Sequence, residues 1–480
     1  MAEDMSPLHK LPPHILQDII TRGNLDAEDF ARLEASSYIF KAASGLMPYR
    51  FKSLPELAAF QLCQNDPLFS VMPLPARSKL SKRCEANWKL ILRYLHAVQQ
   101  AWGRATTRKG NFQVVTGKYH TLLLGNGQLF SCGSSQFGVL GHGPNLTQCT
   151  SLTAIQLPMV SRVICVSGSH HHVAFLTERG EVFTFGDNSS SCCGHGDVGD
   201  TILNPTIVES LKGISCKKVA TGLSFTVALT ENGEVYTWGS NSHGQLGHGD
   251  TNDVAMPGKV AGLSICGLVA MISAGASHTL AVTRDGALYS FGYGANFCLG
   301  HGDTANEHSP RLVESLREQN IFLVGIAAGD EHSVALDSSG YVYTWGKGYC
   351  GALGHGDELD QRTPLLVTAL GSFLSVQVCA RKRKTFAVGV NGSVFAFGWM
   401  GCGSLGLTGR GSSDKVFNPE LLVALASHHV AQISTGLYHT VVIVKNGSVL
   451  GFGDNEKGQL GVDISEATNE PKEMHIPGFS

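Results

Sequence analysis

A glycine-rich unit that recurs along most of the chain is the feature that most limits the possible folds. Residues 231–250 read ENGEVYTWGSNSHGQLGHGD, and the sequence repeats this pattern six more times. The units begin 51 to 55 residues apart, at Gly117, Gly168, Gly222, Gly275, Gly329, Arg381 and Gly436. A fixed period of this size is typical of a repeat architecture, in which each unit is one supersecondary structure.

Each unit predicts a small antiparallel sheet. In the fourth unit the runs HTLAVT and ALYSFG are joined by Asp285-Gly286, a strong hairpin signal. A strand marked by Pro310 follows, and an apolar strand then leads into the next unit. The 57 glycines, against about 34 expected from average usage, fit many tight turns. Four strands in each of seven units predict an all-β seven-bladed β-propeller over residues 111–480, preceded by a small N-terminal α-helical region.

The repeated pattern G-x-x-H-[ST]…G-x-[VL]-[YF]-x-[WF]-G…G-x-L-G-H-G-D resembles the regulator of chromosome condensation repeat family. The resemblance covers residues 111–480. It implies a seven-bladed propeller, the same number of blades that the repeat count gives.

The two ends of the repeat region suggest how the ring closes. Residues 470–477 supply a proline-marked strand for the last blade, and residues 112–116 form an apolar strand before the first repeat. We expect these two chain ends to belong to the same blade, because such pairing removes exposed strand edges.

The recurrent histidines raise the question of a metal site. They occur in the G-H-G-D element (His142, His195, His248, His301 and His355) and in the G-x-x-H element (His120, His171, His278, His332 and His439). Equivalent positions on different blades are too far apart to share one ion through bonds of about 2 Å. We therefore predict that each histidine satisfies backbone groups of its own loop, and we expect no metal and no cofactor. The aromatic residue before each second-strand glycine is expected to pack between blades (Phe185, Trp238, Phe291, Trp345, Phe397 and Phe452).

The sixth unit departs from the pattern. Where the first, fourth, fifth and seventh units have G-x-x-H-[ST], it has Arg381, Lys382, Arg383 and Lys384 before Thr385. Four adjacent cations on one rim could bind an acidic or phosphorylated segment of a protein partner. The alternatives are a solvated loop or a cluster of the nuclear-localisation type.

The first hundred residues contain no repeat. Ile15, Leu16, Ile19 and Ile20 share one helical face after an initial Leu-Pro. Residues 1–50 resemble an F-box, which implies contact with a Skp-type adaptor of a cullin-based ubiquitin ligase through Leu11, Pro12, Ile15, Leu16, Ile19, Leu33 and Phe40. The alternative is a helical cap on the propeller. Residues 51–110 are expected to be a helical linker, because Trp88, Ile91, Leu92, Leu95 and Trp102 recur at helical spacing.

Composition excludes several classes of function. A net charge of −3 and a pI near 6.7 argue against nucleic-acid binding. The sequence has no apolar signal core and no run long enough for a membrane span, and its 13 cysteines form no C-x-x-C pair. We expect a protein of the cytoplasm, the nucleus or both. No paired acids, activated nucleophile or metal constellation rises above the repeat pattern, so we expect no enzymatic activity.

Three classes of function follow. The leading hypothesis is a protein-interaction module that acts as a substrate-recognition subunit of a cullin-type ubiquitin ligase. The alternative is guanine-nucleotide exchange on a Ran-type GTPase, the family's best-known activity, but the even spacing leaves no room for an insertion between blades. Light sensing is the third class, because plant ultraviolet-B receptors share the propeller. Their repeated G-W-R-H-[ST] elements carry tryptophans that this chain lacks (Tyr119, His170, Ser224, Ser277, Glu331, Arg383 and Tyr438).

Overall fold

The computed structural model describes residues 53–101, 105–107, 110–158, 161–196, 199–411 and 414–478. The chain divides into two compact units, Met1–Gln99 and Gln100–Ser480. The predicted boundary at residue 50 lies outside the described residues and stays a prediction.

The first unit is helical in its described part. Its helices are α4 (Leu54–Asn65), α5 (Pro67–Val71), α6 (Leu74–Arg83) and α7 (Trp88–Ala101), the last of which ends in the second unit. The helical spacing predicted for α7 is confirmed, and Ile91, Leu92 and Leu95 are buried. The proline-containing stretch after Asp66 forms α5 and the start of α6. The Asp66 carboxylate caps α5 by accepting hydrogen bonds from the Leu68 and Phe69 amides, and proline is tolerated in a first helical turn.

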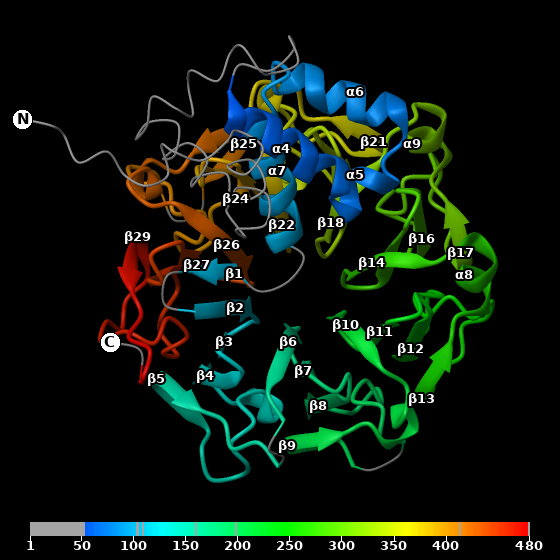
Figure 1. Cartoon of the computed structure of the whole chain (residues 1–480). Helices are drawn as coiled ribbons and strands as arrows, with labels where there is room; N and C mark the ends of the chain where they lie inside the picture. The colour runs from blue at the N-terminus through cyan, green and yellow to red at the C-terminus, as the bar shows by residue number, and fades with distance from the viewer. Residues whose placement is uncertain are drawn as a thin grey trace, which may run out of the picture. The chain divides into compact units, whose positions relative to one another are not determined.

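The second unit is a seven-bladed β-propeller, as predicted, and its sheets follow one another around a ring (Figure 1). Every blade is an antiparallel sheet whose strands lie in sequence order. Blade one contains β1 (Ala105–Thr107), β2 (Gly110–Thr116), β3 (His120–Gly125), β4 (Gln128–Ser134) and β5 (Gln148–Ala154). Blade two contains β6 (Val163–Gly168), β7 (His172–Thr177), β8 (Val182–Asp187) and β9 (Thr201–Ile207). Blade three contains β10 (Cys216–Thr221), β11 (Phe225–Thr230), β12 (Val235–Gly239) and β13 (Val254–Lys259).

The other four blades have the same plan. Blade four contains β14 (Val269–Ala274), β15 (His278–Thr283), β16 (Leu288–Gly292) and β17 (Glu307–Leu312), and blade five contains β18 (Leu323–Ala328), β19 (His332–Asp337), β20 (Val342–Gly346) and β21 (Gln361–Leu366). Blade six contains β22 (Ser375–Arg381), β23 (Lys384–Gly389), β24 (Val394–Trp399) and β25 (Lys415–Leu421). Blade seven contains β26 (Val430–Thr435), β27 (His439–Val444), β28 (Val449–Gly453) and β29 (Thr468–Glu473). Two short helices, α8 (Ala261–Cys266) and α9 (Glu314–Glu318), follow the outer strands of blades three and four.

The hydrophobic core lies between neighbouring blades. One cluster combines Phe225 and Leu246 of blade three with Ile272 and Phe291 of blade four. The aromatic residue predicted to pack between blades is fully buried in all six units. A glycine of the preceding unit lies against it, which is the first glycine of G-H-G in five cases and Gly406 in the case of Phe452. At Gly247, for example, a Cβ would approach the Phe291 ring to 2.8 Å, and φ is +75°. This glycine is required both by the backbone conformation and by the close approach.

The ring closes in a way that differs from our expectation. Residues 112–116 do form a strand, but this strand, β2, pairs with β3 in blade one, and β29 is the outer strand of a blade seven made only of C-terminal strands. Among the described residues, no sheet combines strands from the two ends of the propeller. Blades one and seven instead share a core that includes Val114 and Val441. The Val114 amide donates a hydrogen bond to Gln432 Oε1 (3.0 Å), and the Thr116 amide donates one to Ser434 Oγ (3.1 Å).

Candidate functional site

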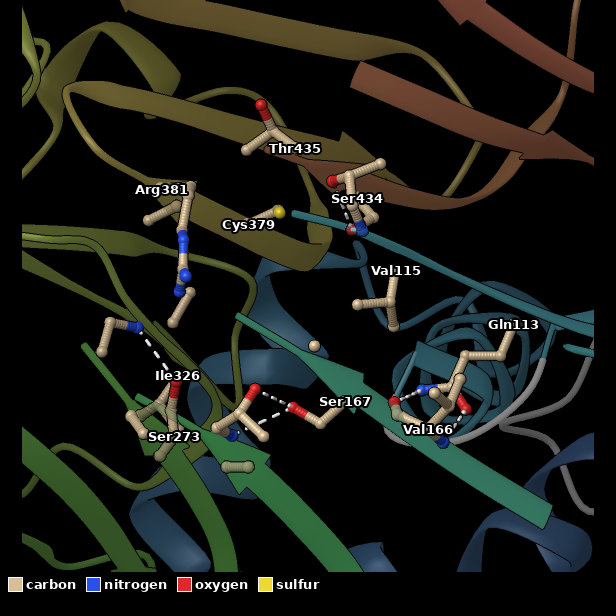
Figure 2. A pocket seen from close by; sticks show the side chains of 18 of the residues that line it. Gln113, Val115, Val166, Ser167, Ser273, Ile326, Cys379, Arg381, Ser434 and Thr435 are labelled. Carbon is tan, nitrogen blue, oxygen red and sulfur yellow. Dashed lines mark hydrogen bonds between the residues drawn. The ribbon is translucent and has the colours of Figure 1, made fainter. Parts of the chain in front are cut away.

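The first strands of the blades surround a central cavity of about 240 Å³. Side chains from one inner strand hydrogen-bond the backbone of the next, as Gln113 does with Val166 and Ser273 does with the Ala328 amide (Figure 2). Among the residues that line the cavity, the only charged groups are Lys218 and Arg381, and there is no acidic residue. In Figure 2 the Arg381 side chain extends from β22 into the space between the strands. The cavity is therefore electropositive.

The histidines of the G-x-x-H element form a ring of contacts between blades. Four of them bond through Nε2 to a hydroxyl near the start of the second strand of the next blade: His172 to Thr226, His278 to Ser333, His332 to Thr385 and His439 to Thr121, at 2.8 to 3.0 Å. Each of these hydroxyls also donates to a backbone carbonyl of the preceding blade. Because a hydroxyl has one proton, it must accept from the histidine, so Nε2 carries the imidazole proton. In the second unit the histidine in this position is His172 rather than the predicted His171.

His120 is the exception in this ring. The residue of blade two that is equivalent in the repeat to these hydroxyl residues is Val173, which has no hydroxyl, and His120 Nε2 has no hydrogen-bond partner although the residue is 1% exposed. Burial, followed by the charge of Arg381, lowers the pKa of His120 to about 3. An unpaired polar group of this kind is unusual in a folded core.

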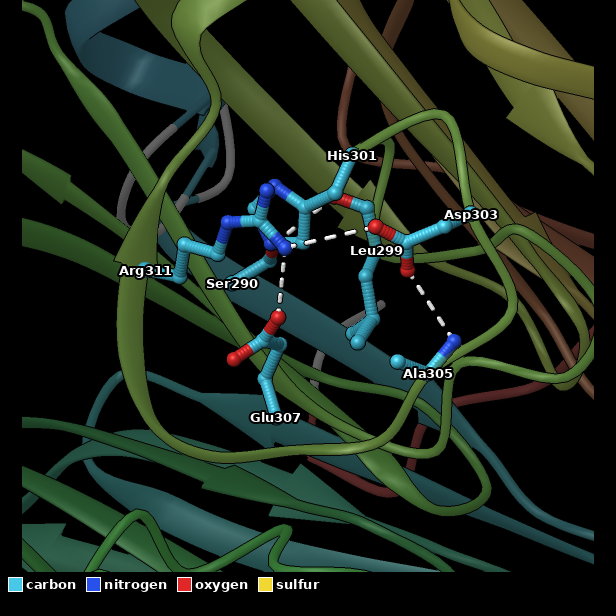
Figure 3. A network of polar contacts seen from close by, with 7 residues as sticks. All are labelled: Ser290, Leu299, His301, Asp303, Ala305, Glu307 and Arg311. Carbon is cyan, nitrogen blue, oxygen red and sulfur yellow. Dashed lines mark hydrogen bonds and ion pairs between the residues drawn. The ribbon is translucent and has the colours of Figure 1, made fainter.

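The histidines of the G-H-G-D element are structural. Each hydrogen-bonds through Nε2 to a Ser or Thr hydroxyl of its own blade, at 2.9 to 3.0 Å. Figure 3 shows His301 in contact with Ser290 beside the surface ion pair between Arg311 and Glu307. Burial lowers the pKa of His301, and the Arg311 charge adds to this effect. The partner of Nε2 is a side-chain hydroxyl, whereas the predicted contact with a backbone group is found for His301 with Ser290 and for His355 with Thr344.

The basic segment of the sixth unit is not a cluster of four exposed cations. Lys384 occupies the column of the G-x-x-H histidines, is fully buried, and donates a hydrogen bond to Ser404 Oγ (2.9 Å). Burial lowers its pKa to about 7. Arg381 is 8% exposed, and its Nε lies 3.8 Å from Asp330 Oδ1 without a hydrogen bond. The prediction of a four-cation rim is wrong for these two residues, since strand alternation turns them inward.

Lys382 and Arg383 are half-buried in the turn between β22 and β23. The Lys382 ammonium lies over the rings of Trp399 and Tyr438, 4.7 and 4.9 Å from their centroids. The Arg383 guanidinium lies 4.5 Å from the centroid of Tyr349. These cation–π contacts hold both cations at the surface with their charge available to a partner.

The described residues contain no cluster of three or more His, Cys, Asp or Glu side chains that could hold a metal ion. No helix within the described ranges has the length and hydropathy of a membrane span. The residues predicted to contact a Skp-type adaptor (Leu11, Pro12, Ile15, Leu16, Ile19, Leu33 and Phe40) lie outside the described residues.

Comparison with known proteins agrees with this architecture. The model of the regulator of chromosome condensation (RCC1) repeat matches residues 126–176, 179–229, 232–282, 285–336, 339–388 and 391–443. The chain belongs to the RCC1 repeat family. It is 34% identical over 366 residues to the ultraviolet-B receptor UVR8 of Arabidopsis thaliana, covering 75% of this chain and 80% of UVR8. It is 30% identical over 356 residues to the human E3 ubiquitin-protein ligase HERC2, covering 72% of this chain but 7% of HERC2.

Solved structures show the same fold. Prp20p of Saccharomyces cerevisiae superposes with a TM-score of 0.66 and 17% identity, over 79% of this chain and 89% of that protein. Human WBSCR16 superposes with a TM-score of 0.64 and 20% identity, over 73% of this chain and 94% of that protein. The family assignment supports a protein-interaction module.

The departure at Val173 could have been found in the sequence. A hydroxyl follows the histidine column in six of the seven units, and Val173 breaks that rule. Alignment of the repeats column by column shows this departure, as it shows that Arg381 stands where five units have glycine.

Proposed function

We propose that this chain is a non-enzymatic recognition subunit, in which the propeller binds a protein client and the N-terminal segment binds a Skp-type adaptor. The client would then be presented to a cullin-type ubiquitin ligase in the cytoplasm or the nucleus. The observation that supports client binding is the pair Lys382 and Arg383, two cations held on aromatic rings at the propeller surface. The adaptor half of the proposal rests on the F-box-like sequence alone.

The client would present an acidic or phosphorylated segment. Partly desolvated cations form stronger pairs with carboxylates or phosphates than fully hydrated ones do, and contact with aromatic rings reduces the entropy lost on binding. No structural observation favours guanine-nucleotide exchange, because the evenly spaced repeats leave no room for an insertion between blades. None favours light sensing either, because the positions that hold tryptophan in the ultraviolet-B receptors hold other residues here.

Affinity purification of the full chain from cells tests both halves. We expect a Skp-type adaptor to co-purify, to be lost in Ile15→Asp with Leu16→Asp, and to be kept in the control His14→Asp with Gln17→Asp, which changes the other face of the same predicted helix. Lys382→Ala with Arg383→Ala should release the client and leave the adaptor bound. If the intact chain retains no adaptor, the ligase role is wrong, whereas equal client recovery in the double alanine variant would refute the proposed surface.

A further inference from the structure

Aromatic rings and cations alternate along the surface on either side of Lys382 and Arg383. The Tyr438 ring, which lies against the Lys382 ammonium, also stacks on Tyr119 of blade one, with the ring centroids 5.9 Å apart. The Lys118 ammonium lies 5.0 Å from the centroid of Tyr119. A continuous row of contacts therefore runs from the turn of blade six, through blade seven, to the turn of blade one.

The row continues in the other direction to blade five. Tyr349, which is 42% exposed, has the Arg383 guanidinium 4.5 Å and the Lys415 ammonium 4.7 Å from its ring centroid. The other cations and rings of the row are half-buried, so the contacts restrict the cations without covering them. We call this row the aromatic–cationic strip, and it consists of Lys118, Tyr119, Tyr438, Lys382, Arg383 and Tyr349.

Three cations of the strip have their charge available to a partner. Among the described residues, Lys118, Lys382 and Arg383 form no ion pair with a carboxylate. The neighbouring Lys415 differs, because it is paired with Glu358 (2.7 Å). A cation held against a ring without an internal counter-ion attracts an acidic group of a partner more strongly than a cation that is already paired.

The turn that carries Lys382 and Arg383 has a backbone that the other blades do not share. Only in blade six does the register between the two strands that flank this turn continue to one further pair, Arg381 with Lys384. Lys382 has φ +50°, a left-handed conformation that is uncommon for a residue with a side chain, and its amide donates to Asp330 Oδ1 (3.1 Å). Uncommon backbone conformations of this kind cluster at functional sites.

The contact distances limit how far apart the cations of blades six and one lie. From Lys382 through Tyr438 and Tyr119 to Lys118, the successive distances are 4.9, 5.9 and 5.0 Å, so the two ammonium groups are at most about 16 Å apart. An extended chain advances about 3.3 Å per residue and spans this distance in about five residues. One extended segment of a partner can therefore reach both groups.

We infer that the aromatic–cationic strip binds an extended segment of the client with two acidic groups, rather than a single phosphorylated residue. One acidic group pairs with Lys382 and Arg383, and the second, no more than about five residues away, pairs with Lys118. Neutral residues of the segment between them lie over the stacked rings of Tyr119 and Tyr438. The inference rests on the client binding proposed above and specifies the ligand of that surface.

Acidic residues beside the strip favour such a segment over a nucleic acid. Burial raises the pKa of Tyr119, and Tyr438, Asp454 and Glu456 add to this effect. Carboxylates at this position repel a chain that carries a negative charge on every unit, as RNA does. A peptide in which neutral residues separate the acidic groups avoids this repulsion.

Two synthetic peptides of equal length and composition test the inference. In the spaced peptide, four neutral Gly and Ser residues separate two Glu-Glu pairs, and in the clustered peptide all four Glu are contiguous. Fluorescence anisotropy with the purified full chain at low ionic strength measures their affinities. We expect the spaced peptide to bind at least threefold more tightly than the clustered one.

Variants at one end of the strip identify the source of this advantage. Lys118→Ala should remove the advantage and leave the affinity of the clustered peptide unchanged, whereas Lys118→Arg, which keeps the charge, should preserve it. The matched control is Lys259→Ala, which removes a surface lysine of blade three that is paired with Glu234 and should change neither affinity.

The outcomes separate this inference from the proposed function. If the clustered peptide binds at least as tightly as the spaced one, or if Lys118→Ala leaves the advantage intact, the inference is wrong, while an acidic client at Lys382 and Arg383 still stands. If neither peptide binds, or if Lys382→Ala with Arg383→Ala binds both as the wild type does, the inference and the acidic client are both wrong. Tighter binding of poly(U) RNA than of the spaced peptide would overturn the inference in favour of a nucleic acid.

Discussion

Val173→Thr should stabilise the propeller by giving His120 the hydroxyl partner that the other four histidines of the ring have. The new hydroxyl would accept from His120 Nε2 and donate to the carbonyl of Val139, the place that the Ala352 carbonyl holds for Thr385. Each buried hydrogen bond contributes a net stabilisation of about 0.5 to 1.5 kcal/mol. Replacing one buried methyl group by a hydroxyl costs about 0.8 kcal/mol of apolar burial. The expected change in the free energy of unfolding is therefore an increase of about 1 kcal/mol.

The reverse substitution provides the matched control. Thr385→Val gains the same methyl group but leaves His332 Nε2 and the Ala352 carbonyl without a partner in the core. Because an unsatisfied buried polar group costs about 1 to 3 kcal/mol, we expect a loss of about 2 to 3 kcal/mol.

Urea unfolding at pH 7, followed by tryptophan fluorescence, measures both variants against the wild type, provided that the m-value stays constant. The reasoning is refuted if Val173→Thr lowers the urea midpoint, or if Thr385→Val leaves it unchanged. Either result would mean that these hydroxyls do not couple neighbouring blades.

Three further predictions concern single contacts. Lys384→Met should stabilise the fold near pH 7, because burial lowers the pKa of Lys384 from 10.5 to about 7 in the folded protein. The wild type should therefore become more stable as the pH rises from about 7 to 10.5. Denaturant titrations at several pH values should show that Met abolishes this gain. Trp345→Phe should cost about 1 to 2 kcal/mol in the same assay, since it loses the bond from Nε1 to the Cys298 carbonyl while keeping a ring that other blades carry natively; no loss would argue against that bond. Ser434→Ala and Ser273→Ala should each cost about 1 kcal/mol, and a much larger cost for Ser434→Ala would show that closure depends on something beyond the contact that Ser273 makes between blades four and five.

The strands and the number of blades could be predicted because the units repeat with a nearly constant spacing and each contains its own hairpin signals. Ring closure could not be predicted from the same pattern. An apolar run at residues 112–116 indicates a strand, but its alternation is the same whichever sheet the strand joins. The register with β3 is a tertiary property, and it placed the strand in blade one.

The basic segment shows the opposite case, in which the sequence contained information that was overlooked. Four consecutive cations suggest a charged loop, yet Lys384 lies in the column of histidines that begin a buried strand. Strand periodicity alone therefore indicated burial for Lys384 and exposure for its neighbour Arg383. That the Arg381 side chain enters the channel could not be predicted, because it depends on the shape of the space left by the missing histidine ring.

Each blade is formed by one uninterrupted stretch of about 50 residues, so the topology does not require any particular blade to come first in the chain. New termini could be introduced at any junction between blades, with the old ones linked, and all seven sheets would keep their own strands. During synthesis on the ribosome every sheet can likewise assemble as soon as its stretch emerges. The ring then closes when Gln432 and Ser434 of blade seven accept hydrogen bonds from the backbone of blade one.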